Sequence, residues 1–223
     1  MRRPWTGTVE PTLIATGPLF GGRSLTTEPF PLLEWDGFFW SGNIKLPVWE
    51  GFQDRLGPYA SRRARKASDG TVKLSVSPLD EEKQSPPSPE QAAAYRYLIA
   101  YQQRIRDSML EAIFDEYPDY RASYIAGYDL DESDETLPVL DRPEQLKDLI
   151  GLSSVLIHPV VREGVAYVGY EFGCAWEEEH GLGAMMHQDR VVTVGQADVA
   201  ILEWIAERDA KPPRRKKKGP GST

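Results

Sequence analysis

Hydrophobic positions follow two different periods along the chain, and each period predicts a different kind of element. Short β-branched and aromatic runs alternate with turn residues over residues 31–46, 71–77 and 155–194, which predicts strands joined by tight turns. Between them, apolar side chains recur at three- and four-residue steps from Tyr95 to Tyr117, which predicts one long amphipathic helix. The predicted fold class is therefore α+β, with a mainly antiparallel sheet of about seven to eight strands packed against the long helix.

The residues at the two ends of the long helix predict where it begins and where it stops. Ser88 can cap the first free amides, Pro89 has no N–H to leave unpaired, and Gln91 stands at the reciprocal position of a capping box. Pro118 would remove a hydrogen bond inside a helix, so the helix is predicted to end there. Residues Tyr124–Tyr128 are then predicted to form a short strand.

Two shorter helices complete the predicted elements: one over residues 141–150, and a C-terminal one that begins at Asp198. The Gly-, Pro- and Thr-rich residues 1–28 predict an extended lead-in. We expect residues 29–210 to form a single α+β domain and residues 211–223 to form a basic disordered tail.

Charge is distributed unevenly along the chain, whose net charge is -8. Six of the 26 Lys and Arg residues follow Ala210, so the body carries 20 basic against 34 acidic residues, which is 20 − 34 = −14. An acidic body repels nucleic acid and favours a basic protein partner. Only the Lys/Arg tail has the charge to contact nucleic acid. No cofactor is indicated by any motif.

Cysteine content and hydropathy indicate the cellular compartment in which the protein is expected. Cys174 is the only cysteine, which excludes an intramolecular disulfide and suits a reducing cytoplasm. Its neighbours Phe172 and Trp176 predict a buried thiol. No stretch approaches the roughly 20 apolar residues that a transmembrane helix needs, so we expect a cytoplasmic protein without membrane contact.

One stretch gathers ionisable, aromatic and turn-forming residues, and it is the segment Trp176-Glu177-Glu178-Glu179-His180-Gly181-Leu182-Gly183. One hypothesis is a small metal-dependent or acid–base hydrolase, with Glu178 and His180 as catalytic candidates and His187 across a predicted hairpin. The spacing does not match the helical His-Glu-x-x-His arrangement, so no metal ligands are assigned. No activated serine or phosphate-binding glycine loop accompanies these residues, which leaves the catalytic set incomplete.

The other hypothesis is structural. If the strand alternation continues past Cys174, it places Glu178 and His180 on the core side and Glu177 and Glu179 on the opposite side. His180 is then expected to lie on the core side, within hydrogen-bond reach of a carboxylate or carbonyl, and to fix the glycine turn. On this hypothesis the stretch borders a binding surface, for which the candidates are Trp176, Glu177, Glu179, His180 and His187. The sequence favours a non-enzymatic binding protein, with the hydrolase as the alternative.

The same stretch resembles the C-terminal hallmark of a bacterial family of domains of unknown function. In that family a motif of the form Phe-x-Cys-x-Trp-[Asp/Glu]-x-Glu-His-Gly-[Leu/Val]-Gly closes an α+β unit, and here it corresponds to residues 172–183. The resemblance extends upstream through Trp35-Asp36-Gly37 and Leu46-Pro47-Val48-Trp49, and covers about residues 30–205. It implies no known activity. It does imply a setting near polymorphic toxin and immunity loci, which is consistent with an immunity-like binding protein.

Overall fold

A computed structural model describes residues 12–15, 23–55, 66–130, 137–177 and 179–211 of the chain. The described strands are β1 (Thr12–Ala15), β2 (Arg23–Thr26), β3 (Leu33–Trp35), β4 (Trp40–Lys45), β5 (Thr71–Val76), β6 (Ile150–Arg162), β7 (Val165–Cys174), β8 (Leu182–His187) and β9 (Arg190–Gly195). The described helices are α1 (Pro89–Tyr128) and α2 (Glu203–Ala210), with short 3-10 helices η1 (Pro47–Trp49), η2 (Pro143–Asp148) and η3 (Ala197–Ala200).

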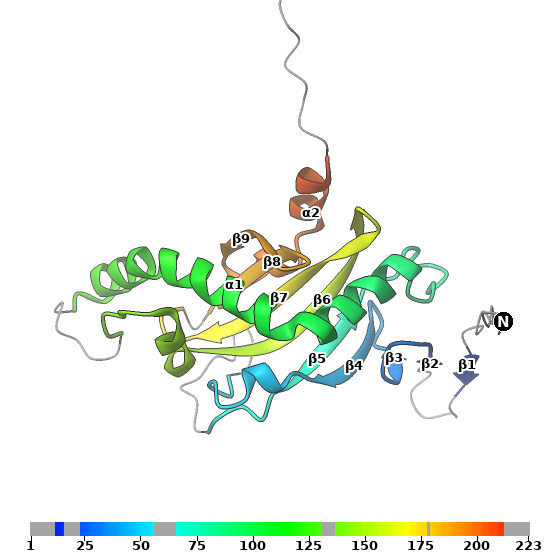
Figure 1. Ribbon diagram of the computed structural model, residues 1–223, viewed down its shortest axis with the longest axis horizontal. Coiled ribbons are helices and arrows are strands. Elements are labelled where there is room, and N and C mark those ends of the chain that lie inside the picture. Colours follow the sequence, from blue (N-terminus) through cyan, green and yellow to red (C-terminus); the bar gives the residue numbers. More distant parts are fainter. Residues whose placement is uncertain (1–11, 16–22, 56–65, 131–136, 178, 212–223) are drawn as a thin grey trace, which may run out of the picture.

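The nine described strands form one sheet in which each strand lies beside its neighbours in the chain. Every pairing is antiparallel except that of β5 with β6, which is parallel. A parallel pair needs a crossover connection, and α1 lies in this connection and crosses one face of the sheet (Figure 1). The predicted α+β class, with one long helix, a short helix and a C-terminal helix, is confirmed.

The start of α1 is built as the sequence predicts. The Ser88 hydroxyl accepts a hydrogen bond from the Gln91 amide at 3.2 Å, and the Gln91 side-chain oxygen accepts one from the Ser88 amide at 2.9 Å. The Gln91 side-chain amide also donates to the carbonyls of Ser77 and His158, at 2.7 and 3.1 Å. The capping residue therefore ties the beginning of the helix to β5 and β6.

The end of α1 differs from the prediction. The helix passes through Pro118 and ends at Tyr128, so the predicted end at Pro118 and the predicted strand over Tyr124–Tyr128 are both wrong. The turn around Pro118 is held by tertiary contacts, because the Tyr117 hydroxyl donates to the Pro138 carbonyl at 2.8 Å and Arg121 donates to the Leu137 carbonyl at 2.7 Å. These contacts offset the backbone hydrogen bond that proline removes.

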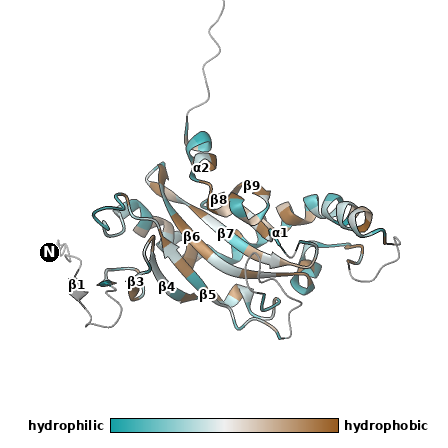
Figure 2. Ribbon diagram, turned by 180° about the vertical axis from the view of Figure 1, so that it is seen from behind, coloured by the Kyte–Doolittle hydropathy of each residue, from teal (hydrophilic) through white to brown (hydrophobic). Residues whose placement is uncertain are grey.

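The main core lies between α1 and the sheet. The predicted helix stripe supplies Leu98, Ile105, Met109 and Ile113 to it, all 2 % exposed or less. Hydrophobic and hydrophilic segments alternate along α1, as expected for a helix with one buried face (Figure 2). None of the helices in the described parts of the chain has an apolar stretch long enough to cross a bilayer.

A smaller cluster covers the opposite face of the sheet. There Tyr167 of β7 and Met185 of β8 pack against Ile205 and Ala206 of α2. Strand β6 carries a register shift between Ile157 and Val161, on either side of Pro159, which has no N–H for a ladder hydrogen bond.

Strands β1 and β2 lie within residues 1–28 and pair with each other, and β2 pairs with β3. The division into a lead-in, a domain from residue 29 to 210 and a tail stays a prediction. Residues 212–223 of the tail lie outside the described residues.

Candidate functional site

The stretch after β7 forms a turn that the Glu177 side chain holds closed. Its Oε1 accepts hydrogen bonds from the amides of Glu179 and His180, both at 3.2 Å, and lies 3.4 Å from Nδ1 of His180. The Glu177 carbonyl accepts from the Gly181 amide at 3.2 Å and from the Cys174 thiol at 3.5 Å. Gly181 has φ of +62°, a conformation that favours glycine.

This geometry corrects the predicted orientation of the motif. The His180 side chain is 47 % exposed, so the prediction that it lies on the core side is wrong, and its carboxylate neighbour is Glu177. The physical reason is that β7 ends at Cys174, after which two-residue alternation no longer applies and the i to i+3 spacing of a turn governs the contacts. Glu178, the predicted catalytic candidate, lies outside the described residues.

The second glycine of the motif, Gly183, allows close packing of the backbone. A Cβ atom on Gly183 would lie 2.6 Å from the Gln196 carbonyl oxygen and 2.8 Å from that of Ala197. The His180 carbonyl also accepts a hydrogen bond from the Ala197 amide at 3.0 Å. The turn and strand β8 are therefore joined directly to η3, which fixes the position of the loop before η3.

A cavity of about 230 Å³ lies between this turn and the C-terminal part of α1. It is lined by Tyr120, Ser123, Tyr124, Tyr128, Trp176, Glu177, Gly181, Leu182, Gly195 and Gln196. A cavity of about 150 Å³ is large enough to bind benzene, and drug-sized ligands occupy about 300–1,000 Å³. The space thus suits a group the size of one amino-acid side chain.

Aromatic rings form one wall of the cavity. Tyr120 stacks on Trp176, with ring centroids 5.6 Å apart and planes 13° apart, and Tyr117 meets the same indole edge-on at 5.4 Å. Tyr124 and Tyr128, one turn apart on α1, have centroids 4.8 Å apart. Trp176 is 8 % exposed, whereas Tyr128 is 68 % exposed, so the wall runs from the core to the surface.

The C-terminal half of α1, which supplies one wall of the cavity, carries a net negative charge. Residues 111–130 contain five acidic side chains and one basic side chain, Arg121, which donates to the Leu137 carbonyl. Burial, and after it the Glu116 carboxylate, raise the pKa of Tyr120. The last turn of α1 carries no basic residue, so the partial negative charge of the helix C-terminus adds to that of the carboxylates. The arrangement favours a cation.

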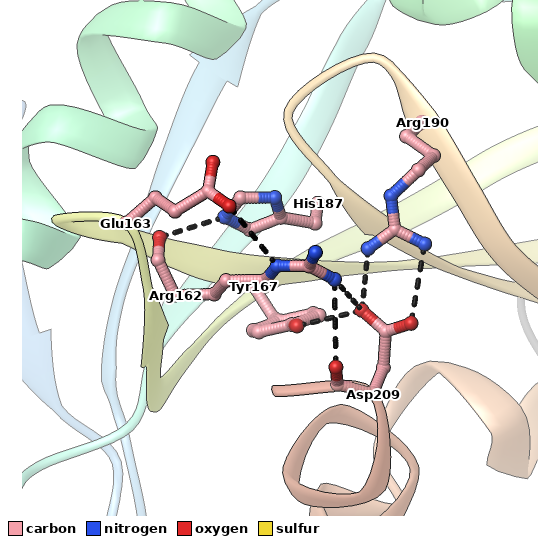
Figure 3. Close-up of polar contacts among 6 residues, drawn as sticks. All are labelled: Arg162, Glu163, Tyr167, His187, Arg190 and Asp209. Carbon is pink, nitrogen blue, oxygen red and sulfur yellow. Dashed lines mark hydrogen bonds and ion pairs between the residues drawn. The ribbon is translucent and has the colours of Figure 1, made fainter. Parts of the chain in front are cut away.

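His187 does not belong to this site. Strand β8 separates it from the turn, and five residue steps of about 3.3 Å place the ends of the strand about 17 Å apart. His187 is buried, its Nε2 lies 2.9 Å from the Arg162 carbonyl oxygen, and its ring contacts that of Tyr167. Figure 3 shows it beside a cluster in which Asp209 of α2 contacts Arg162, Arg190 and the Tyr167 hydroxyl. This cluster attaches α2 to the sheet.

Titratable groups are also buried in or beside the sheet, namely Cys174, Arg55 and His158. Burial raises the pKa of the Cys174 thiol to about 12, which agrees with the predicted buried, protonated cysteine. Arg55 is buried beside it and donates to the Cys174 carbonyl at 3.0 Å. His158 was not a candidate on sequence grounds; burial lowers its pKa to about 4, and its Nε2 lies 2.9 Å from the Ala200 carbonyl oxygen. Their contacts assign these groups to the packing of the core.

The described residues contain no group of three or more His, Cys, Asp or Glu side chains placed to hold a metal ion. Of the sequence candidates, the structure brings together Trp176, Glu177, Glu179 and His180 in or beside one turn, with Trp176 and Glu177 lining the cavity. The helix tyrosines were missed because the helix was predicted to stop at Pro118. Their four-residue spacing, Tyr120, Tyr124 and Tyr128, is the signal that could have found them.

Fold and site define an α+β domain with an aromatic, acidic cavity at the end of its long helix. Residues 52–202 match the model of a family described as Domain of unknown function (DUF6985), and the chain belongs to this family. The expected membership of such a family is confirmed, while its bacterial origin and C-terminal motif stay predictions. The matched span includes every residue that lines the cavity, whereas Asp209 lies beyond it. No curated protein and no solved structure matches the chain.

Proposed function

We propose that this protein is a non-enzymatic binding protein that recognises a basic protein partner through the face around the cavity. The observation that carries the proposal is the cavity itself, in which an acidic turn and the negative end of α1 enclose an aromatic wall. Trp, Tyr and Arg side chains in well-packed pockets contribute most of the binding energy at protein interfaces, and complementary charge adds specificity and faster association. An immunity-like role, in which the partner is a basic toxin, is one form of this function.

The charge of the whole body supports the same proposal. Without the six basic residues after Ala210, the chain has a net charge of −14, from 20 basic and 34 acidic residues. A field of this sign accelerates encounter with a basic protein and weakens as salt is added, because charges further apart than about 8–10 Å are screened at physiological ionic strength. Part of this charge lies at the cavity, because Glu177 lines it and the Glu116 carboxylate raises the pKa of Tyr120 in its wall.

The test is affinity capture from a lysate of the host organism with the full chain as bait, at about 50 mM and about 500 mM salt, which differ strongly in screening length. Nuclease treatment removes nucleic acid that could bridge proteins to the Lys/Arg tail. We expect a basic protein, identified by mass spectrometry, to be captured intact at low salt and released at high salt. The purified pair should then bind with a Kd that rises with salt. If no basic protein is retained at low salt, or the captured protein is processed by the bait, the proposal is wrong.

A further inference from the structure

The Glu177 carboxylate holds the turn with only one of its oxygens. Within the described residues, all three of its contacts, with the amides of Glu179 and His180 and with Nδ1 of His180, are made by Oε1. The side chain is 34 % exposed and lines the cavity. Oε2 is therefore an acceptor that the turn does not use, on a side chain whose position the turn fixes.

The part of the cavity wall that α1 supplies is aromatic. Tyr120, Tyr124 and Tyr128 follow each other at four-residue steps on α1, and Ser123 of the same helix also lines the cavity. Aromatic faces attract cations through the ring quadrupole, and Tyr hydroxyls and Ser123 add hydrogen-bond acceptors. A ligand held here would meet a fixed carboxylate on one side and rings on the other.

We propose that the cavity takes the guanidinium group of an arginine side chain from the basic partner protein. This inference rests on the proposed function and names the group that the site recognises. The planar guanidinium fits against a tyrosine ring, can donate to Oε2 of Glu177, and carries five N–H donors for the hydroxyls and carbonyls around it. A lysine ammonium is more strongly hydrated and does not stack, so the partly apolar cavity discriminates against it.

The chain offers a direct readout of occupancy. The Trp176 indole is 8 % exposed and lines the cavity, and its N–H can be followed in a ¹H–¹⁵N NMR spectrum of the full chain after assignment of the six tryptophans. Trp204 is the internal control, because it is 51 % exposed and already has the Arg208 guanidinium 5.2 Å from its ring centre. Non-specific contact of a cation with exposed tryptophans would move the Trp204 signal as well.

The probes are acetyl-arginine amide, acetyl-lysine amide and the uncharged acetyl-citrulline amide, titrated at constant ionic strength. We expect acetyl-arginine amide to shift the Trp176 signal in a saturable way while the Trp204 signal stays in place. The lysine probe should bind at least about tenfold more weakly, and the citrulline probe should cause no saturable shift. Equal binding of arginine and citrulline probes, or of arginine and lysine probes, would overturn the inference.

Two matched variants connect the signal to the carboxylate. Glu177→Gln keeps an oxygen that can accept from the amides of residues 179 and 180, so the turn is retained, but the charge is removed. Glu179→Gln removes the same charge from an exposed side chain that does not line the cavity. Binding of acetyl-arginine amide should weaken by about tenfold or more in Glu177→Gln and by less than about twofold in Glu179→Gln. Equal affinities in the two variants would count against the role of Glu177.

The failure of this inference and that of the proposed function give different results. If acetyl-arginine amide does not bind but a basic protein is still captured in a salt-sensitive way, the arginine site is wrong and the proposed function stands. If the probe binds as described but no basic protein is captured, the proposed function is wrong. Thermal melting of both variants confirms that each is folded under the conditions of the titration.

Discussion

Replacing Asp209 by asparagine removes the charge that attaches the C-terminal helix α2 to two hairpins of the sheet. One carboxylate oxygen of Asp209 accepts from Arg162 at 3.1 Å and from the Tyr167 hydroxyl at 2.7 Å, and the other accepts from Arg190 at 3.2 Å (Figure 3). Hydrogen bonds from Arg190, Tyr167 and Arg162 to the carboxylate lower the pKa of Asp209 from 3.8 to about 2, against the opposing effect of burial. The asparagine variant leaves two guanidinium groups side by side without their shared anion.

The loss of stability in Asp209→Asn can be worked out from the pKa of Asp209. A carboxyl whose pKa falls from 3.8 to about 2 on folding stabilises the folded state by about 2 kcal/mol at neutral pH. The side chains of Arg162 and Arg190 are 36 % and 46 % exposed, so water and salt screen the cluster. We therefore expect the Asp209 charge to stabilise the folded state by about 1 kcal/mol. Because the folded-state pKa is the lower one, this contribution is complete above about pH 5 and is lost as the pH falls from about 4 towards 2.

The assay is urea denaturation of the wild type and Asp209→Asn at pH 7, 5 and 3.5, followed by circular dichroism. Asp115→Asn, at an exposed position of α1, is the control for removal of one negative charge. We expect Asp209→Asn to be less stable than the control by about 1 kcal/mol at pH 7, and the difference to shrink at pH 3.5. A difference that is absent at pH 7, or that does not change with pH, would refute the assignment of the cluster as a charge-dependent attachment.

Three further predictions concern the scaffold of the site. Gly183→Ala should lower the free energy of unfolding, measured by urea denaturation, by about 2 kcal/mol, because its Cβ would press on a carbonyl oxygen 2.6 Å away. Gly127→Ala should raise it by about 0.5–1 kcal/mol, because its Cβ meets nothing within 4 Å and alanine favours the helix. Similar effects of the two substitutions would contradict the packing role of Gly183. Ser88→Ala should cost about 1 kcal/mol in the same assay, and an unchanged midpoint would show that the capping box is dispensable. Cys174, with its pKa raised to about 12, should react with a thiol reagent at pH 8 only after unfolding, and rapid labelling of the native protein would contradict its burial.

Local signals in the sequence predicted elements well where local forces decide the structure. The capping box at Ser88 and the helix stripe are each encoded by residues a few positions apart, and both are present. The continuation of α1 beyond Pro118 is decided by tertiary contacts of Tyr117 and Arg121, which no local pattern contains. For that reason the helix tyrosines of the cavity were missed, although their four-residue spacing is visible in the sequence.

The motif around His180 shows the same limit at a smaller scale. The orientation of its residues depends on where β7 stops, because the two-residue alternation of side chains holds only within the strand. The strand ends at Cys174, so Glu177 became the carboxylate that holds the turn and lines the cavity. Two of the candidate residues, Trp176 and Glu177, line the cavity, and their placement there follows from the fold.

The most direct test of the central claim compares the partner affinity of two variants that differ only in which glutamate loses its charge. For the basic protein captured by the wild type, isothermal titration calorimetry should give a Kd at least about tenfold higher for Glu177→Gln, while Glu179→Gln stays within about twofold of the wild type. Equal losses in the two variants, or none in either, would contradict a cavity that binds its partner through Glu177.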